Sequence, residues 1–303
     1  MAAPTSTRIE RDPAIPGVLH LAAREPGPRV VLFAGTHGDE ISGLHAVEKL
    51  FFDLHSGARE MLRGRLTLVR ANAQAIAAER RYLRYNLNRL FRDEYDAGIA
   101  SEAYEPRRAQ ELKPLLHDCD YFLDLHSAPI AQEPFLVAER HAADFYARLG
   151  IPRIIVGWGR FSSGPIGGDA ESYANAHGAQ AATLESGSHF DKRSNDVAYR
   201  TVLALLSELG MLEGVERPTQ AETELIEMYA VVVKESEDFR YAGVAANFKP
   251  LARGEAFAFQ GGAPLVAGED SVLLIPMQPE ETKLGEEVCY LGRRLDRVLS
   301  MPG

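Results

Sequence analysis

The chain repeatedly places a short apolar run, rich in β-branched residues, next to a longer segment with helical periodicity. The runs are "RVVLFAG" (29–35), "RLTLVRAN" (65–72), "YFLDLHS" (121–127), "RIIVGWG" (153–159) and "AATLESG" (181–187). Runs of this kind are typical of strands buried on both faces. Helical patterns cover 40–54 and 195–209, and Gly210 is placed to end the second of them. The alternation predicts an α/β fold in which helices flank a sheet.

The character of the sequence changes from about residue 222 onward. Short strand-like runs follow one another there, separated by Gly, Pro and Asn: "YAVVV", "EAFAF", "SVLLIP" and "EEVCYLG". The segment "EGVERPTQ" precedes them and has the composition of a linker. We therefore predict a catalytic α/β domain over 1–218 and a small β-rich C-terminal domain over 219–303.

Composition excludes several classes of protein. The chain has 33 basic and 43 acidic residues among 303, a formal net charge of −10, which argues against nucleic acid as a partner. Its apolar stretches are far shorter than the roughly 20 residues of a membrane helix, and the N-terminus lacks an apolar signal core. The two cysteines, Cys119 and Cys289, have no metal-site or redox spacing. A cytoplasmic protein with inert thiols, bound to neither membrane nor nucleic acid, is expected.

Four polar side chains come at or just after the ends of predicted strands. His37 and Glu40 follow the first strand, His126 ends the third, and Glu185 ends the fifth. Open α/β sheets bind ligands beyond the carboxyl ends of their strands, so these residues are expected to converge. Two His and one Glu form a common catalytic zinc set that leaves a position for water, and a further Glu can act as general base. A bare His-x-x-Glu is more often a solvated surface pair, but its place after a strand favours the Zn²⁺ site.

A second cluster of interest is "RRYLRYNLNRLF", residues 80–91. One interpretation is the basic face of an amphipathic helix. The other is an anion pocket, because a guanidinium group binds a carboxylate through two parallel hydrogen bonds that Lys cannot copy. In an acidic protein, such a local patch suggests a small anionic substrate.

Five motifs in this order resemble the succinylglutamate desuccinylase and aspartoacylase family, which is related to the zinc carboxypeptidases. They are "GTHGDEISG", "ANAQA", "RYLRYNLNRLF", "LDLHS" and "TLESGSH", followed by a β-rich tail. The resemblance implies a zinc-carboxypeptidase-like mixed sheet flanked by helices. It also implies Zn²⁺ bound by His37, Glu40 and His126, with Glu185 as the catalytic carboxylate.

Roles for the substrate-binding residues also follow from this resemblance. Asn88 and Arg89 match the pair that holds a substrate carboxylate, and Arg81 matches the residue that stabilises the developing oxyanion. Tyr290 is the best match to a tyrosine of the C-terminal domain that reaches the substrate.

Three departures from the family pattern bear on specificity. Asn86 stands where the family has Asp, and "ANAQA" replaces "ANPxA". The segment "AESYANAHGAQAATLE" also lacks the extra Arg with which aspartoacylases hold a second carboxylate. Specificity for N-acetylaspartate is therefore not implied.

The leading hypothesis is a zinc-dependent amidohydrolase that removes an acetyl or succinyl group from a small N-acyl amino acid bearing a free carboxylate. A metallocarboxypeptidase acting on short peptides would use the same ligands and stays open as an alternative. A zinc-stabilised binding protein without turnover is less consistent with Glu185, because structural zinc sites are normally closed by four protein ligands. The acyl group, the amino acid and the oligomeric state, including a homo-oligomer, are left open.

Overall fold

The computed structural model describes residues 7–95, 98–129, 132–161, 167–216 and 222–300. Its helices are α1 (Ile41–His55), α2 (Ala73–Ala77), α3 (Tyr104–His117), α4 (Arg140–Tyr146), α5 (Ala170–Ala176) and α6 (Lys192–Glu208), with short 3-10 turns η1 (Leu87–Arg89), η2 (Ala147–Leu149) and η3 (Trp158–Phe161). Its strands are β1 (Arg8–Arg11), β2 (Val18–Ala22), β3 (Glu25–Ala34), β4 (Arg63–Arg70), β5 (Tyr121–Ala128), β6 (Phe135–Ala138), β7 (Arg153–Val156), β8 (Gln180–Ser188), β9 (Glu222–Val233), β10 (Arg240–Tyr241), β11 (Pro250–Leu251), β12 (Ala256–Gln260), β13 (Ala263–Val266), β14 (Ser271–Leu274) and β15 (Glu287–Ser300).

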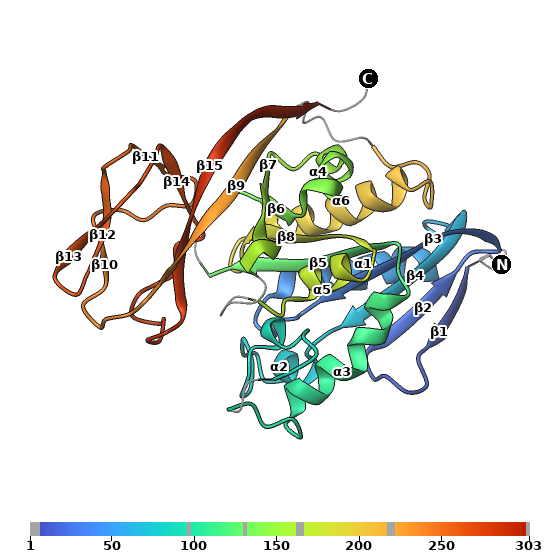
Figure 1. Cartoon of the computed structure of the whole chain (residues 1–303). Helices are drawn as coiled ribbons and strands as arrows, with labels where there is room; N and C mark the ends of the chain where they lie inside the picture. The colour runs from blue at the N-terminus through green and yellow to red at the C-terminus, as the bar shows by residue number, and fades with distance from the viewer. Residues whose placement is uncertain (1–6, 96–97, 130–131, 162–166, 217–221, 301–303) are drawn as a thin grey trace.

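A large mixed sheet forms the centre of the molecule (Figure 1). Among the described residues it contains twelve strands, in the order β1-β2-β4-β3-β5-β8-β6-β7-β9-β15-β14-β11, and β10, β12 and β13 form a separate small sheet. The strands β4, β3, β5 and β8 are parallel neighbours, whereas β6 runs antiparallel to β8. The predicted α/β class with a mixed sheet is confirmed.

Helices cover both faces of the central strands, and the two-residue period of a strand decides which side chain faces which layer. Along β3, Val30, Leu32 and Ala34 belong to the core cluster that contains residues of α1 and α6. Val31 and Phe33 belong instead to the cluster with α3 and α5. A continuous apolar run is therefore required at this strand, because neither face meets water.

The predicted helices form with small differences at their ends. The helix predicted over 195–209 begins at Lys192, because the side chain of Asp191 caps its first turn, and Gly210 follows it with φ +63°. Residues 80–91 do not form the amphipathic α-helix that was one interpretation of them; they contain bends and the turn η1. No helix among the described residues is long and apolar enough to cross a membrane.

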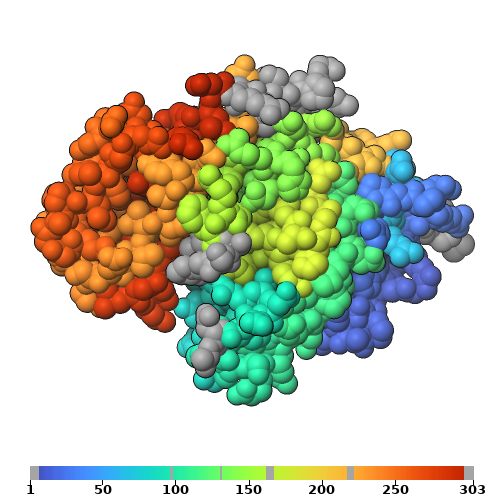
Figure 2. Space-filling view, in the orientation of Figure 1, coloured from blue at the N-terminus to red at the C-terminus, as the bar shows by residue number. Residues whose placement is uncertain are grey.

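The C-terminal strands extend the same sheet. The strand β9 lies parallel to β7, and the long strand β15 pairs with β9 in antiparallel fashion. Figure 2 shows the C-terminal residues as a lobe packed against the rest of the molecule. The predicted domain boundary, between residues 218 and 219, falls outside the described residues and stays a prediction. Cys119 and Cys289 are both buried and free, and burial raises the pKa of each thiol to about 12.

Candidate metal centre and active site

The loop after β3 brings two polar side chains to one point. The backbone at Gly35 has φ +67°, a conformation that favours glycine, and the Glu40 N–H donates to the carbonyl of His37 at 3.2 Å. Gly38 is needed for a different reason, since a Cβ there would lie only 2.2 Å from the backbone of Ala75. The loop therefore presses against α2 and turns back, so that His37 and Glu40 face each other.

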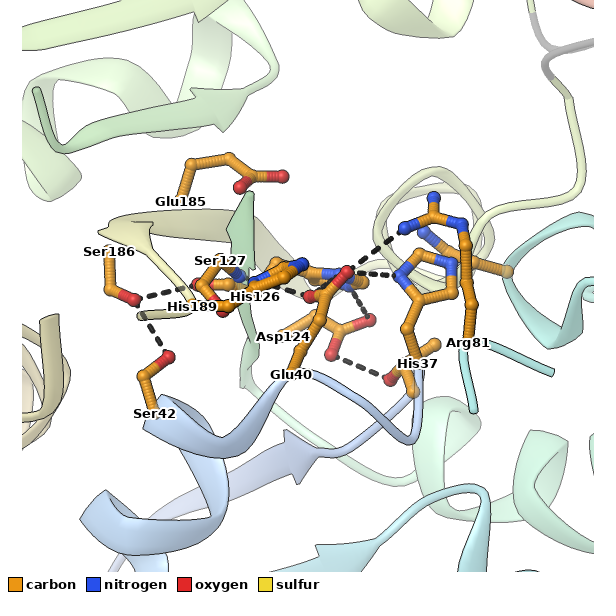
Figure 3. A network of polar contacts seen from close by, with 12 residues as sticks. His37, Glu40, Ser42, Arg81, Asp124, His126, Ser127, Glu185, Ser186 and His189 are labelled. Carbon is orange, nitrogen blue, oxygen red and sulfur yellow. Dashed lines mark hydrogen bonds and ion pairs between the residues drawn. The ribbon is translucent and has the colours of Figure 1, made fainter. Parts of the chain in front are cut away.

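His37, Glu40 and His126 form a buried cluster at the ends of β3 and β5 (Figure 3). The Nδ1 atom of His37 lies 2.7 Å from Glu40 Oε1, and the Nδ1 atom of His126 lies 2.9 Å from Glu40 Oε2. Each of the three residues is at most 3% exposed. One possible ligand atom from each lies within 4.8 Å of the others, so the three residues predicted as zinc ligands are close enough to share one ion.

Two further residues orient the histidine rings from behind. Asn86 Oδ1 lies 3.0 Å from Nε2 of His37, and Asp124 Oδ2 lies 3.0 Å from Nε2 of His126. Partners of this kind fix which ring nitrogen faces a metal. Asp124 is missing from the sequence prediction, although "LDLHS" signals it, because residues two apart in a strand share a face. Asn86, noted only as a departure from the family, now has a defined contact.

The electrostatics of the cluster suit a cation. Burial alone would raise the pKa of Glu40, but the positive charge that the rings of His37 and His126 carry when protonated, together with their contacts to the carboxylate, outweighs burial and holds that pKa well below its usual range. Desolvation, followed by the charge of Arg81, lowers the pKa of His37 to about 4, so this imidazole is a neutral donor near pH 7. Desolvation would lower the pKa of His126, but the charges of Asp124 and Glu40 outweigh it and raise that pKa well above its usual range, so a metal bound there would displace a proton from this ring. Two imidazole rings and a carboxylate are the donor set that zinc prefers, and the residues present therefore fit this metal.

The other predicted site residues line one cavity of about 90 Å³ together with His37 and His126. They are Arg81, Asn88, Arg89, Glu185 and Tyr290. Arg81 contacts Glu40 Oε1 at 3.1 Å, and Arg89 is paired with Glu287 at the start of β15. The hydroxyl group of Tyr290 is buried and, among the described residues, has no hydrogen-bond partner. Residues from both ends of the chain thus meet around the candidate metal centre.

Glu185 projects from β8, directly opposite His126 in the register of the neighbouring strand β5. In Figure 3 it lies beside the cluster and is joined to none of the labelled residues by a dashed line. Desolvation is the main cause that raises its pKa to about 7, and the negative charge of Glu40 adds to it. A carboxyl group with a pKa near neutrality can both accept and donate a proton.

A chain of amide side chains connects Glu185 to the C-terminal region. Gln132 Nε2 donates to Glu185 Oε2 at 3.4 Å, and Asn247 Nδ2 donates to Gln132 Oε1 at 3.1 Å. Neither Gln132 nor Asn247 carries a signal in the sequence, because the two contacts join residues that are 53 and 115 positions apart.

His189, four residues beyond Glu185, lies beside the cluster (Figure 3). Its Nδ1 atom is 2.7 Å from the hydroxyl oxygen of Ser127, the residue after His126. With Asp39 and Glu40 it also forms a group whose possible ligand atoms lie within 4.8 Å of one another. It does not line the cavity that holds Glu185 and the arginines.

Fold and site together define a class of protein: mixed-sheet α/β proteins with a buried His-Glu-His group beyond the carboxyl ends of central parallel strands. A family model described as the succinylglutamate desuccinylase/aspartoacylase catalytic domain matches residues 26–209. The chain therefore belongs to the succinylglutamate desuccinylase/aspartoacylase family, as the five motifs predicted.

The individual relatives have low sequence identity to this chain, but their similarity extends over most of its length. A succinylglutamate desuccinylase of Vibrio vulnificus (strain YJ016) is 26% identical over 266 residues, covering 81% of this chain and 75% of that protein. One from Pseudomonas paraeruginosa is 27% identical over 282 residues, covering 86% and 83%. The crystal structure of succinylglutamate desuccinylase from Vibrio cholerae superposes with a TM-score of 0.78 at 21% identity, covering 99% of this chain and 95% of that one. The likeness in fold thus extends over nearly the full length of both chains.

Proposed function

We propose that this protein is a zinc-dependent deacylase that hydrolyses the amide bond of a small N-acyl amino acid with a free carboxylate. Membership of a family whose members include succinylglutamate desuccinylases supports hydrolytic deacylation. The observation that carries the proposal is the shared cavity: His37 and His126, the carboxyl group of Glu185, and Arg81 and Arg89 all line it.

His37, Glu40 and His126 would hold the metal. Zinc bound there would supply Lewis acidity and lower the pKa of a coordinated water toward 7. Asn86 and Asp124 keep Nδ1 of each histidine turned toward Glu40 and away from solvent. The protein thus prepares the ligand geometry before any substrate enters.

Glu185 carries the proton in this proposal. With a pKa of about 7, its carboxylate accepts a proton from the water that attacks the acyl carbonyl. The same group then donates that proton to the nitrogen of the departing amino acid. Gln132 holds one carboxyl oxygen of Glu185 at 3.4 Å, which limits rotation of the group during the transfer.

In this proposal the two arginines bind different parts of the substrate: Arg81 meets the acyl carbonyl oxygen and Arg89 meets the free carboxylate. Arg81, which is 43% exposed in its side chain and reaches Glu40, is placed to meet the carbonyl oxygen as charge develops on it. Arg89 is anchored by Glu287 and by the carbonyl of Asn88 at 2.8 Å, and its remaining N–H groups serve the substrate carboxylate. Asn88 and the free hydroxyl of Tyr290 complete the pocket.

A carboxypeptidase that cleaves short peptides is the second candidate. One observation favours it: a hollow of about 700 Å³ begins at Gln132 and Ser186, next to Glu185, and offers room for a longer chain. The narrow cavity beside the candidate metal ligands favours the deacylase, because its volume is only about 90 Å³ and Tyr290, Ile275 and Met277 of the C-terminal region form part of its wall. Confinement also excludes water and strengthens the contacts of the arginines.

The test is a substrate series measured with the zinc-loaded protein. N-acetyl and N-succinyl amino acids with a free carboxylate should be hydrolysed, and their carboxamide counterparts should be poor substrates. Chelation should abolish the activity and added zinc should restore it. Efficient release of C-terminal residues from tetrapeptides, without deacylation, would replace the proposal with the carboxypeptidase.

A further inference from the structure

Two acidic side chains line the candidate active-site cavity without a part in the reaction described above. They are Asp169, which precedes helix α5, and Glu171, in the first turn of that helix. Asp169 is 5% exposed and Glu171 is 2% exposed. Carboxyl groups are seldom buried to this extent unless an opposite charge or a hydrogen-bond donor lies beside them.

The partners of these two groups in the protein are neutral. One oxygen of Asp169 accepts from the backbone N–H of Ser172 at 2.7 Å, while its Oδ2 atom is buried with no hydrogen-bond partner in the part of the chain that the structure describes. Glu171 accepts from the side-chain amide of Asn175. Desolvation raises the pKa of both carboxyl groups, and for Glu171 the nearby charge of Asp169 raises it further.

Neither arginine of the cavity forms an ion pair with Asp169 or Glu171. The lining includes two arginines: Arg81 contacts Glu40, and Arg89 is paired with Glu287. Arg89 favours the ionised form of Asp169 from a distance, but its ion pair is with Glu287. The segment "AESYANAHGAQAATLE", which runs from α5 to Glu185, contains neither Arg nor Lys. A substrate with a second carboxylate would therefore meet Asp169 and Glu171 with no cation to balance it.

We infer that the substrate of this protein is an N-acyl diamino acid, whose side-chain ammonium group binds Asp169 and Glu171. The inference rests on the proposed deacylase function and specifies its substrate class. The free α-carboxylate is held by Arg89 and Asn88, and the ammonium group satisfies the unpartnered Oδ2 atom of Asp169. An ammonium group offers three donors, enough for both carboxyl groups. A charge-assisted pair in such a dry site is stronger than the neutral contacts it replaces.

Matched substrate pairs test the inference. Nα-acyl-2,4-diaminobutyrate is compared with Nα-acyl-norvaline, and Nα-acyl-ornithine with Nα-acyl-norleucine, because each pair differs only by an ammonium group in place of a methyl group. Nα-acyl-glutamate supplies the opposite charge, and every compound is made with an acetyl and with a succinyl group. In at least one pair, kcat/KM should be about 10- to 100-fold higher for the cation than for its isostere.

The outcomes separate this inference from the function on which it rests. If glutamate derivatives are preferred, or if cation and isostere are cleaved equally, the diamino acid assignment is overturned while the deacylase stands. If no compound of either acyl series is cleaved, the deacylase proposal itself falls and the assignment falls with it.

A variant then ties the preference to the named residues. Glu171→Gln keeps the size of the side chain and an oxygen for Asn175, so the fold is retained. The preference for cation over isostere should fall about tenfold, while kcat/KM for the isostere stays within about threefold. Asp169→Asn should act in the same direction. An unchanged preference in both variants, or an equal loss on all substrates, would assign the two acids a structural role only and overturn the inference.

The control is Glu227→Gln, on strand β9. This carboxylate is also buried, pairs with Arg140 of α4 and Arg293 of β15, and does not line the cavity. Its preference should match that of the parent protein. Thermal unfolding of all three variants shows that each is folded at the assay temperature.

Discussion

The strands β3, β5 and β8 and the C-terminal region from β9 to β15 contribute to one cavity in opposite ways. The parallel strands carry the groups to which we assign the reaction: His126 and Glu185 lie in register on neighbouring strands, and His37 follows the third. The C-terminal region supplies walls, chiefly Ile275, Met277 and Tyr290. Parallel strands end at a common edge and gather polar residues there, whereas antiparallel ribbons offer long surfaces that can cover an edge. In the proposed function, reactivity and confinement therefore come from different parts of the chain.

Backbone strain also differs between the two regions. In the loop after β3, the left-handed conformation falls on Gly35, which adopts it without cost. In the C-terminal region it falls on Phe248 (φ 63°) and on the β-branched Ile275 (φ 45°). The side-chain oxygen of Asn247 accepts from the N–H groups of both, at 3.1 and 2.9 Å. The wall of the cavity is thus held in an unfavourable conformation by the same residue that contacts Gln132, the neighbour of Glu185.

The largest effect is expected from a change at Glu185, on the parallel strand β8. Glu185→Gln should lower kcat by roughly 10² to 10⁴, the usual contribution of a positioned general base, with zinc content and KM little changed. Single-turnover kinetics and metal analysis measure the two properties separately. Glu224→Gln, on β9 and paired with Arg153 and Arg294, is the control and should retain parental activity. Near-parental turnover of Glu185→Gln would return that residue to a structural role.

Arg89 joins the two regions, since it lies on η1 and pairs with Glu287 of β15. Arg89→Lys keeps the charge but loses the planar fork, so we expect kcat/KM for a carboxylate substrate to fall about 10- to 100-fold. Arg293→Lys, which alters an ion pair with Glu227 outside the cavity, should change kcat/KM by less than about twofold. Equal losses in both variants would mean that Arg89 acts through stability rather than through the substrate.

A change at Asn86 tests how far the candidate metal centre depends on the contacts behind its ligands. Asn86→Ala removes the acceptor for Nε2 of His37, and zinc affinity should fall about 10- to 100-fold, while activity at saturating zinc changes less. Competition with a chromogenic chelator measures this affinity. Asn86→Asp, which keeps an acceptor and adds charge, should bind zinc at least as tightly as the parent; a loss as large as that of the alanine variant would contradict this account.

The smallest effect is expected from a change at Tyr290, in the cavity wall that the C-terminal region provides. Tyr290→Phe keeps the ring, whose centroid is 4.8 Å from that of Trp158, and removes a buried hydroxyl group that has no partner among the described residues. Activity should fall only a few fold through KM, while the free energy of unfolding rises by about 1 kcal/mol. Kinetics and urea unfolding measure the two changes.

Tyr229→Phe is the matched control, because its hydroxyl bonds to Ser271 at 2.7 Å and it does not line the cavity. Its stability should fall while its activity stays unchanged. The same stability change in both variants would show that the hydroxyl of Tyr290 is satisfied in solution.

Much of the fold and the core of the site could be predicted because both depend on local patterns. The apolar runs require strands with both faces buried, and the polar residues at their ends follow from chain order alone. The limits of prediction lie where a contact joins distant segments. Asp124 could have been predicted, because it lies two positions before His126 in the same strand. The contacts of Gln132 with Glu185 and Asn247 could not, because they form only where β8 and the C-terminal region fold against the same loop.

The sequence by itself determined the α/β class, the family and the seven polar residues from His37 to Glu185 that belong to its motifs, because each depends on residue type and spacing along the chain. Only the tertiary structure decided that Asp169 and Glu171 line the cavity and that Glu287 forms an ion pair with Arg89. It also decided that the hydroxyl group of Tyr290 has no hydrogen-bond partner among the described residues. The physical reason is burial. A carboxyl or hydroxyl group becomes costly, and therefore informative about a ligand, only once folding has removed it from water and fixed its distance from every opposite charge.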